Sequence, residues 1–310
     1  RIAARHGVDP DRVLVTAGAD DGLDRCLRAY AGPGRAVIHT DPTFEMIPRY
    51  ARLTGAPLRA VPWSEGAFPR EAFLAAAGDQ PGVLAVVTPN NPTGAVASAA
   101  DLAALAAACP EALLLVDLAY GEFADEDLTA AALALPNAVV LRSFSKALGM
   151  AGLRVGYVLG PAPVVGALRS AGHPYAVTGP SIRLVTAALE GDLFEAAAYA
   201  RRARTERRDL EALLGRLGLG PVPSQGNFVF LRPAAGPSAA LRIHRDLAAL
   251  GISVRRFPGR AGLEGALRIT CPGDPGEFSR LCAALETSRA PEALLFDMDG
   301  VLADVSGSYH

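Results

Sequence analysis

Residues 138–146 read Ala-Val-Val-Leu-Arg-Ser-Phe-Ser-Lys. An apolar run this short, bounded by turn-forming residues, predicts a buried strand over Ala138–Arg142. Lys146 follows the end of that strand, and the hydroxyl residues Ser143 and Ser145 stand between them. Taken alone, a lysine in such a place is most simply an exposed loop residue, so its meaning depends on the sequence around it.

Further short apolar runs predict strands of the same kind, namely Val13–Thr16, Ala36–His39, Val83–Thr88, Leu113–Asp117 and Val155–Leu159. Between them, apolar residues recur at spacings of three and four, which predicts helices over Asp20–Ala31, Thr43–Thr54 and Ser98–Ala108. Ser98 suits the N-cap of the last helix, with Asp101 in its first turn. The alternation of strands and helices indicates an α/β fold with a mainly parallel sheet covered on both faces.

The pattern changes in the C-terminal half. A long helical stretch is predicted over Ser181–Leu214, and its charged run Arg201–Arg208 is most simply a solvated face. Beyond Gly218 we expect a smaller α+β unit, whose strands are Asn227–Leu231, Ser253–Arg256 and Ala266–Thr270 and whose helices are Leu241–Leu250 and Pro275–Leu285. The predicted domains are therefore 1–215 and 216–288, followed by a separate segment over 289–310.

Composition excludes several classes of protein. The chain has 310 residues, 50% of them hydrophobic, and 30 basic against 32 acidic residues give a net charge of −2. Such a chain can bury a core, but it lacks the basic excess of proteins that bind nucleic acid or anionic membranes. It has no apolar run long enough to span a bilayer. Its scattered cysteines, Cys26, Cys109, Cys271 and Cys282, indicate neither a disulfide framework nor a zinc site, so we expect a reducing, cytoplasmic setting.

Polar residues stand at the ends of the predicted strands. The turn-forming run Pro89-Asn90-Asn91-Pro92-Thr93-Gly94 follows one strand, and Asp117 ends the next, with Tyr120 three residues later. Open α/β sheets bind ligands at such carboxyl ends. Asp117 either caps the next helix or holds a cation, because a buried carboxylate needs a partner. Arg154 either opens a strand as a surface cation or binds a phosphate through its planar fork.

The ordered set Asn91, Asp117, Tyr120, Ser143, Lys146 and Arg154 resembles fold type I pyridoxal-phosphate enzymes. Within them the sequence is most similar to histidinol-phosphate aminotransferases, over Arg1–Glu286. The resemblance implies a mainly parallel seven-stranded sheet between helices, with a smaller C-terminal α+β domain. It also implies pyridoxal 5'-phosphate as the cofactor.

The resemblance implies roles for these residues. Lys146 forms the internal aldimine and moves the substrate proton, Asp117 pairs with the pyridinium nitrogen, and Asn91 and Tyr120 contact the ring's phenolic oxygen. Ser143, Ser145 and Arg154 bind the cofactor phosphate, together with the backbone N–H groups of Ala19 and Asp20 at a helix N-terminus that Gly18 makes accessible. Phe44 stacks on the ring, although a core aromatic is the simpler interpretation of that residue alone.

The smaller unit is expected to hold substrate. Arg268, in Leu267-Arg268-Ile269-Thr270, matches the family arginine that binds the substrate carboxylate. Asn227 is either a further polar residue near the substrate or part of a turn before a strand. The chain opens on Arg1, and we expect it to be a piece of a longer polypeptide. The family's N-terminal segment is expected to be missing from this piece.

Three readings of the activity follow. The first is an aminotransferase that acts on histidinol phosphate, or a similar amino-phosphate or aromatic amino acid, with 2-oxoglutarate as the second partner. The second is a threonine-phosphate decarboxylase-like enzyme, which shares these motifs. The third is an inactive fragment that binds pyridoxal phosphate. The family resemblance implies a homodimer. We expect no metal ion, and the balanced charge predicts neither a nucleic-acid nor a membrane partner.

The last segment carries a different motif. Leu294-Leu295-Phe296-Asp297-Met298-Asp299-Gly300 resembles the first motif of haloacid-dehalogenase-type phosphatases. That resemblance implies Asp297 as nucleophile and Asp299 as acid and base, both near Mg²⁺. We expect the start of a truncated phosphatase domain, which would make the parent polypeptide a fusion.

Overall fold

The larger of two sheets contains the six strands predicted between residues 13 and 159, together with one strand, Leu58–Pro62, that was not predicted. The computed structural model describes residues 1–191 and 194–288. A seven-stranded sheet has the order β1-β7-β6-β5-β4-β2-β3. Its strands are β1 (Val13–Thr16), β2 (Ala36–Asp41), β3 (Leu58–Pro62), β4 (Pro81–Val87), β5 (Leu113–Asp117), β6 (Ala138–Ser143) and β7 (Gly156–Leu159). β7 pairs antiparallel with β1 and β6, and the remaining pairs are parallel, which confirms the mainly parallel sheet.

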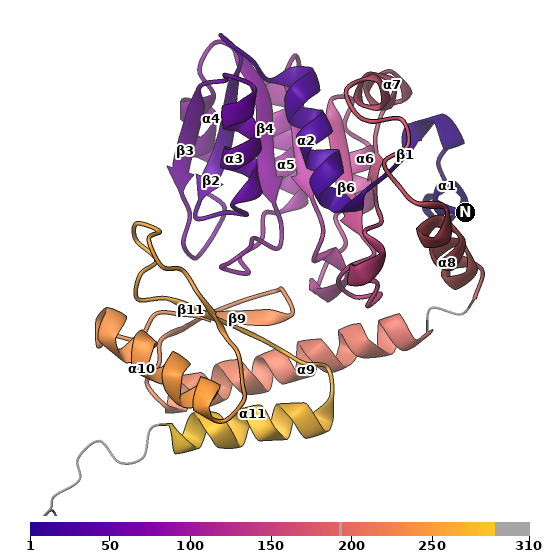
Figure 1. Ribbon diagram of the computed structural model, residues 1–310. Helices are drawn as coiled ribbons and strands as arrows, with labels where there is room; N and C mark the ends of the chain where they lie inside the picture. The colour runs from indigo at the N-terminus through magenta and orange to yellow at the C-terminus, as the bar shows by residue number, and fades with distance from the viewer. Residues whose placement is uncertain (192–193, 289–310) are drawn as a thin grey trace, which may run out of the picture.

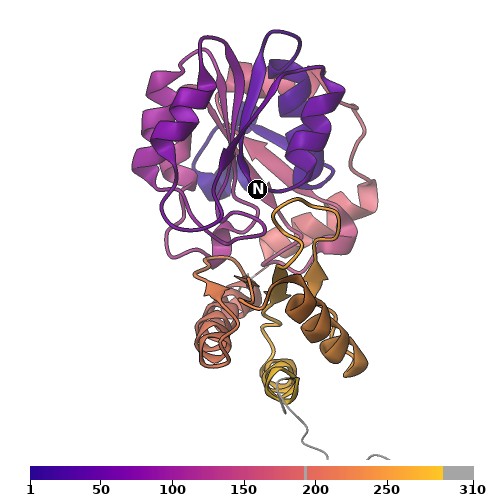
Figure 2. The same ribbon diagram turned by 90° about the vertical axis from the view of Figure 1, so that its left-hand side faces the viewer.

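Helices cover both faces of this sheet (Figures 1 and 2). One face packs against α2 (Gly18–Tyr30), α3 (Met46–Leu53) and α7 (Ala162–Ser170), and the other against α4 (Arg70–Ala77), α5 (Ala99–Ala108) and α6 (Thr129–Leu133). Successive residues of a strand enter opposite cores, so Val83 and Ala85 pack on one side of β4 and Leu84 and Val86 on the other. Burial on both faces explains why the strands are continuous apolar runs.

A second, four-stranded sheet has the order β10-β11-β9-β8 and is antiparallel throughout. Its strands are β8 (Pro221–Val222), β9 (Phe228–Leu231), β10 (Arg255–Arg256) and β11 (Leu267–Thr270). Its core also contains side chains of α9 (Phe194–Arg216), α10 (Gly236–Ala249) and α11 (Pro275–Thr287). α9 supplies Leu210 and Leu213 to this core. The limits of the two domains, 1–215 and 216–288, stay a prediction.

The remaining elements are short or lie at the edge of the larger sheet. They are α1 (Ile2–His6), α8 (Gly179–Glu190) and the 3₁₀ turns η1 (Pro10–Arg12), η2 (Gly121–Phe123) and η3 (Ala151–Leu153). Among the described residues, no helix combines the length and apolar character needed to cross a bilayer. The phosphatase-like motif with Asp297 and Asp299 lies outside the described residues.

Local signals explain where several helices begin and end. Ser98 is the N-cap of α5, as expected, and it forms a capping box with Asp101 in which each side chain accepts the other residue's backbone N–H. The long helix predicted over Ser181–Leu214 was wrong as a single element, because α8 ends at Glu190. Gly191 caps it with an extended backbone, at φ −82° and ψ 179°.

The charged run of α9 also differs from its prediction as a solvated face. Glu206 and Arg207 are buried, with 6% and 3% of their surface exposed. Glu206 accepts the backbone N–H of Gly273, and the Nε of Arg202 donates to the carbonyl of the same glycine at 2.8 Å. The run therefore binds neighbouring backbone, and a pattern of charges cannot distinguish such a face from a solvated one.

Candidate active site

Polar side chains from several strand ends meet in one pocket, here called the lysine pocket. It lies at the carboxyl edge of the parallel strands, where β4, β5 and β6 end, and includes the N-terminus of α2. Its lining residues are Ala19, Asp20, Phe44, Val87, Asn91, Asp117, Ala119, Tyr120, Ser143, Ser145, Lys146 and Arg154. The structure thus brings together every residue predicted to bind the cofactor except Gly18, which lies directly behind Arg154.

Asp117 is the buried acid of the lysine pocket. It ends β5 with 4% of its surface exposed, and its Oδ1 accepts the backbone N–H of Ala119 at 2.9 Å. Burial raises the pKa of Asp117 to about 6, whereas that hydrogen bond and the charge of Lys146 act in the opposite direction. A carboxylate in this state favours a cationic partner in the pocket, because such a partner offsets the cost of its burial.

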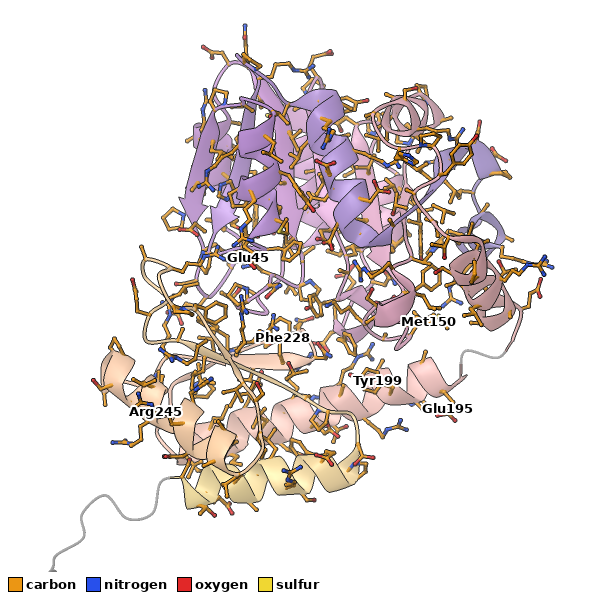
Figure 3. All side chains as sticks on the ribbon, in the orientation of Figure 1. Glu45, Met150, Glu195, Tyr199, Phe228 and Arg245 are labelled. Carbon is orange, nitrogen blue, oxygen red and sulfur yellow. The ribbon has the colours of Figure 1, made fainter. Side chains whose placement is uncertain are left out.

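Lys146 lies against an aromatic ring. Its Nζ is 5.1 Å from the centroid of Tyr120, which packs edge-to-face on Phe228 at 5.1 Å between centroids. Phe228 comes from β9 of the second sheet and lies on the side of that sheet facing the first (Figure 3). The lysine therefore lies where the two sheets meet.

The N-terminal turn of α2 and Arg154 form a cradle for an anion. A Cβ on Gly18, which has φ +77°, would lie 2.6 Å from Nη2 of Arg154, so a side chain there would displace the guanidinium. Nη1 of Arg154 donates to Ser145 Oγ at 3.3 Å, and Nη2 pairs with Asp20 at 3.2 Å. Arg154 itself has a left-handed φ of 51°, a strained conformation that is often found at binding sites.

A second cavity, here called the arginine pocket, adjoins the first. Its lining residues are Thr43, Phe44, Glu45, Asn91, Pro92, Tyr120, Lys146, Arg255, Phe257, Arg260 and Arg268. Nη1 of Arg268 donates to Oδ1 of Asn91 at 2.6 Å, which joins the two sheets. The predicted substrate residue Asn227 is absent from the linings of both pockets, and its amide donates to the hydroxyl of Tyr199 at 3.3 Å.

The sequence matches a known family over most of its length. Residues 1–285 match the family model described as aminotransferase class I and II. The chain belongs to the class I and II aminotransferases. It is 35% identical over 290 residues to histidinol-phosphate aminotransferase 1 of Thiobacillus denitrificans, covering 92% of this chain and 74% of that protein.

Solved structures agree with the fold of this aminotransferase. Histidinol-phosphate aminotransferase from Sinorhizobium meliloti, in complex with pyridoxal-5'-phosphate, matches with a TM-score of 0.82 and 28% identity. That match covers 93% of this chain and 79% of the other. L-threonine-O-3-phosphate decarboxylase from Porphyromonas gingivalis matches with a TM-score of 0.74 and 25% identity, over 92% and 86% of the two chains.

The residues of this aminotransferase fit pyridoxal phosphate. The cradle of Gly18, Ser145 and Arg154 suits its phosphate, and the buried carboxylate of Asp117 suits a protonated ring nitrogen. Lys146 brings a primary amine into the same pocket, and pyridoxal enzymes need such an amine. Across the described residues, we find no group of three or more His, Cys, Asp or Glu side chains placed to hold a metal ion.

Some site residues were missed from the sequence. Glu45, Arg255 and Arg260 line the arginine pocket, and only the adjacent arginines in the predicted strand Ser253–Arg256 hinted at a site. Asn90, in the turn-forming run Pro89–Gly94, was not assigned a role in the site. It is fully buried, accepts from the hydroxyl of Thr43 at 3.0 Å, and so fixes the segment that carries Phe44 against Asn91.

Proposed function

We propose that this aminotransferase uses pyridoxal phosphate to move an amino group between histidinol phosphate, or a similar amino-phosphate or aromatic amino acid, and 2-oxoglutarate. The observation that carries the proposal is the adjacency of the two pockets. Lys146 lines both of them, so an amine and an anion-binding surface face the same space. The named relatives act on histidinol phosphate, which has both an amino group and a phosphate.

Each pocket residue then has a definite task. When bound, pyridoxal phosphate supplies a carbonyl that condenses with amines and a ring that takes up negative charge. Asp117 keeps the ring nitrogen protonated, because its buried carboxylate favours a cation. Asn91 and Tyr120 orient the ring's phenolic oxygen, Phe44 covers the ring face, and Arg154 with Ser143 and Ser145 holds the phosphate.

Lys146 is the proton carrier of this proposal. Its Nζ lies beside Tyr120 at the boundary of the two pockets, where it can reach the Cα of an amino substrate. As a neutral amine it removes the proton from the Cα of the substrate. As an ammonium it then gives a proton to the carbon that will carry the transferred amino group. Transamination needs both steps, and one amine next to both pockets can perform them.

Anion recognition falls to the arginine pocket. Arg268 lies 4.9 Å over the ring of Phe228, and its planar fork suits a carboxylate or a phosphate. Arg255 and Arg260 add positive charge to the same cavity, while Glu45 pairs with Arg255 at 3.7 Å. A cavity lined by these arginines favours substrates whose second functional group is anionic.

A decarboxylase is the second candidate, and its support is the match to threonine-phosphate decarboxylase. The two reactions share the cofactor and differ in the bond that breaks. Release of CO₂ from O-phosphothreonine, with no keto acid consumed, would favour the decarboxylase over the aminotransferase.

An absorbance experiment tests the proposal. We expect pyridoxal phosphate to give the purified enzyme a visible band that Lys146→Ala removes, and histidinol phosphate to convert that band to the pyridoxamine phosphate spectrum. A Lys146-dependent band that ignores histidinol phosphate, but responds to another amino donor, would reject the substrate alone. A folded enzyme without a Lys146-dependent band would reject the cofactor assignment.

Two further proposals concern the setting of the enzyme. We propose that it acts in the cytoplasm as a homodimer. Light scattering of the purified enzyme measures its molar mass and so tests the dimer. The free thiols of Cys26, Cys109, Cys271 and Cys282 are compatible with a reducing compartment.

We also propose that residues 294–302 begin a phosphatase domain. Asp297→Asn should then abolish Mg²⁺-dependent phosphatase activity of the native polypeptide and leave transamination unchanged.

A further inference from the structure

One buried arginine of α9 holds two segments that belong to different sheets. Nη1 of Arg207 donates to the carbonyl of Phe123 at 3.1 Å and to the carbonyl of Gly226 at 3.2 Å. Phe123 belongs to η2, which follows β5 of the larger sheet, and Gly226 precedes β9 of the smaller one. Burying a guanidinium is costly unless its donors are used. Here Nη1 joins these two segments, while the buried Nε has no hydrogen-bond partner among the described residues.

Neighbouring contacts reinforce this junction. Arg204, one turn earlier on α9, donates through Nη2 to the carbonyl of Glu122 at 2.6 Å. The backbone N–H of Asp125 donates to Oε1 of Gln225 at 2.9 Å, which links the same two segments a second time. Asp125 also lies 3.8 Å from Nη2 of Arg207 and balances part of its charge.

Each segment leads directly to a ring of the active site. Tyr120 lies three residues before Phe123, and Phe228 lies two residues after Gly226. The two rings contact each other edge-to-face at 5.1 Å between centroids. Nζ of Lys146 lies 5.1 Å from the Tyr120 centroid, and Cζ of Arg268 lies 4.9 Å from the Phe228 centroid.

We propose that Arg207 is a positioning residue, which fixes the spacing between Lys146 and Arg268 by holding the Tyr120–Phe228 ring pair. The spacing sets how far apart the amino group and the anionic group of a substrate can lie. This inference rests on the proposed roles of Lys146 and Arg268. Arginine suits the task because one guanidinium reaches two carbonyls, whereas a lysine ammonium is a point donor on a flexible stem.

The test measures binding of succinate, a dicarboxylate without an amino group, to the cofactor-loaded enzyme by calorimetry. We expect Arg207→Met to weaken succinate binding about tenfold, the size expected for a lost network of hydrogen bonds to a charged group. Cofactor affinity should fall less than succinate affinity, since Arg207 reaches the lysine pocket through Tyr120 and makes no contact with the cradle of Gly18, Ser145 and Arg154. Arg207→Lys should restore part of the succinate affinity, and Arg208→Met, an exposed neighbour, should have no effect.

A double-mutant cycle separates positioning from general stability. If Arg207 acts through Arg268, then Arg207→Met should add little to the loss already caused by Arg268→Lys. Independent, additive losses would overturn the proposal. So would an Arg207→Met enzyme that melts at a lower temperature but binds succinate like the wild type. If Arg207→Met does not fold, unchanged succinate binding by Arg207→Lys overturns the proposal equally.

The same measurements distinguish failure of this inference from failure of the proposed function. Arg268→Lys weakens succinate binding if Arg268 holds the substrate anion. An Arg268→Lys enzyme that binds succinate normally would therefore reject the proposed role of Arg268 and the inference with it. Weakened binding by Arg268→Lys, together with normal binding by Arg207→Met, would reject only the inference.

Discussion

The lysine pocket and the arginine pocket share Phe44, Asn91, Tyr120 and Lys146, yet they are built differently. Every residue that lines the lysine pocket comes from positions 19–154, on strand ends and loops of the larger sheet and at the N-terminus of α2. The arginine pocket adds Arg255 and Arg268 from strands of the second sheet, and Phe257 and Arg260 from the segment between those strands. One pocket therefore depends on a single scaffold, and the other depends on how two scaffolds meet.

Beside the arginine pocket, three arginines make polar contacts from the second unit to the larger sheet's loops. Arg268 binds Asn91, Arg260 donates to the carbonyl of Thr43 at 3.0 Å, and Arg255 pairs with Glu45. Changes in the lysine pocket should thus alter cofactor chemistry directly. Changes at the meeting surface should alter substrate affinity first and leave cofactor affinity close to normal.

The largest effect on activity is expected at Asp117. Asp117→Asn should lower the transamination rate by about 10²-fold or more, because the amide cannot hold a cation on the ring nitrogen. The measurement is kcat with saturating cofactor, with Asp209→Asn, an exposed position on α9, as the control. A variant with more than half of the wild-type kcat would remove Asp117 from the chemistry.

Asp117→Asn should also stabilise the cofactor-free enzyme. The carboxyl has a pKa of about 6 in the folded chain against an ordinary 3.8, so the folded chain binds its proton more tightly than the unfolded chain does. The free energy of unfolding therefore falls as pH rises from about 4 to 6, by about 3 kcal/mol in total. Thermal melts should show the variant above the wild type at pH 8 and level with it at pH 4. Equal gains at both pH values would contradict the assigned cause.

The next effect is expected at the anion cradle. Arg154→Met should weaken pyridoxal phosphate binding about tenfold to a hundredfold, because a charge-assisted contact with phosphate is lost. Since Arg154 is half exposed, part of the wild-type affinity should disappear in high salt, and the variant should respond less to salt. Fluorescence titration measures both, with the exposed Arg183→Met as the control. Equal salt dependence in the two enzymes would place the phosphate elsewhere.

The sequence predicts the lysine pocket, which is built on one sheet, better than the arginine pocket, which is built where two units meet. Strands β1 and β5 match their predicted limits. β5 is a short apolar run buried on both faces, which leaves little choice of structure, whereas β1 is an edge strand on which Val15 is exposed. The lysine pocket was predictable since its side chains directly follow such strands. Arg260 and Glu45 were not, because their placement depends on contacts between segments about 200 residues apart, which no local pattern records.

The buried charges of α9 show the same limit. Arg207 and the exposed Arg208 are neighbours in one charged run, and periodicity alone does not assign the buried side of a helix that packs mainly through alanine and leucine. Only the carbonyls of Phe123 and Gly226 explain why one of the two is buried. Sequence prediction thus succeeded where apolar burial decides the structure and failed where polar contacts between distant segments do.

A smaller effect is expected from the contact between Arg260 and the Thr43 carbonyl. Arg260→Met should raise KM for the amino donor about threefold to fivefold and change kcat less, because uniform binding is lost and the lysine pocket is untouched. The exposed Arg245→Met on α10 (Figure 3) is the matched control. If cofactor affinity fell while KM rose, the two pockets would not be as separable as their linings indicate.

The smallest effect on catalysis is expected at the capping box of α5, which is remote from both linings. Ser98 Oγ accepts the N–H of Asp101 at 3.1 Å, and Asp101 Oδ2 accepts the N–H of Ser98 at 2.9 Å. Ser98→Ala should lower the free energy of unfolding by about 1 kcal/mol, the usual cost of losing an N-cap. Urea unfolding measures this loss, and the exposed Ser238→Ala, which caps no helix, should leave stability unchanged.

Because α5 packs on the larger sheet without lining either pocket, kcat, KM and cofactor affinity should match the wild type. A change in cofactor affinity would mean that the larger sheet transmits small losses of stability to its carboxyl edge, and that the lysine pocket is less rigid than a single scaffold suggests.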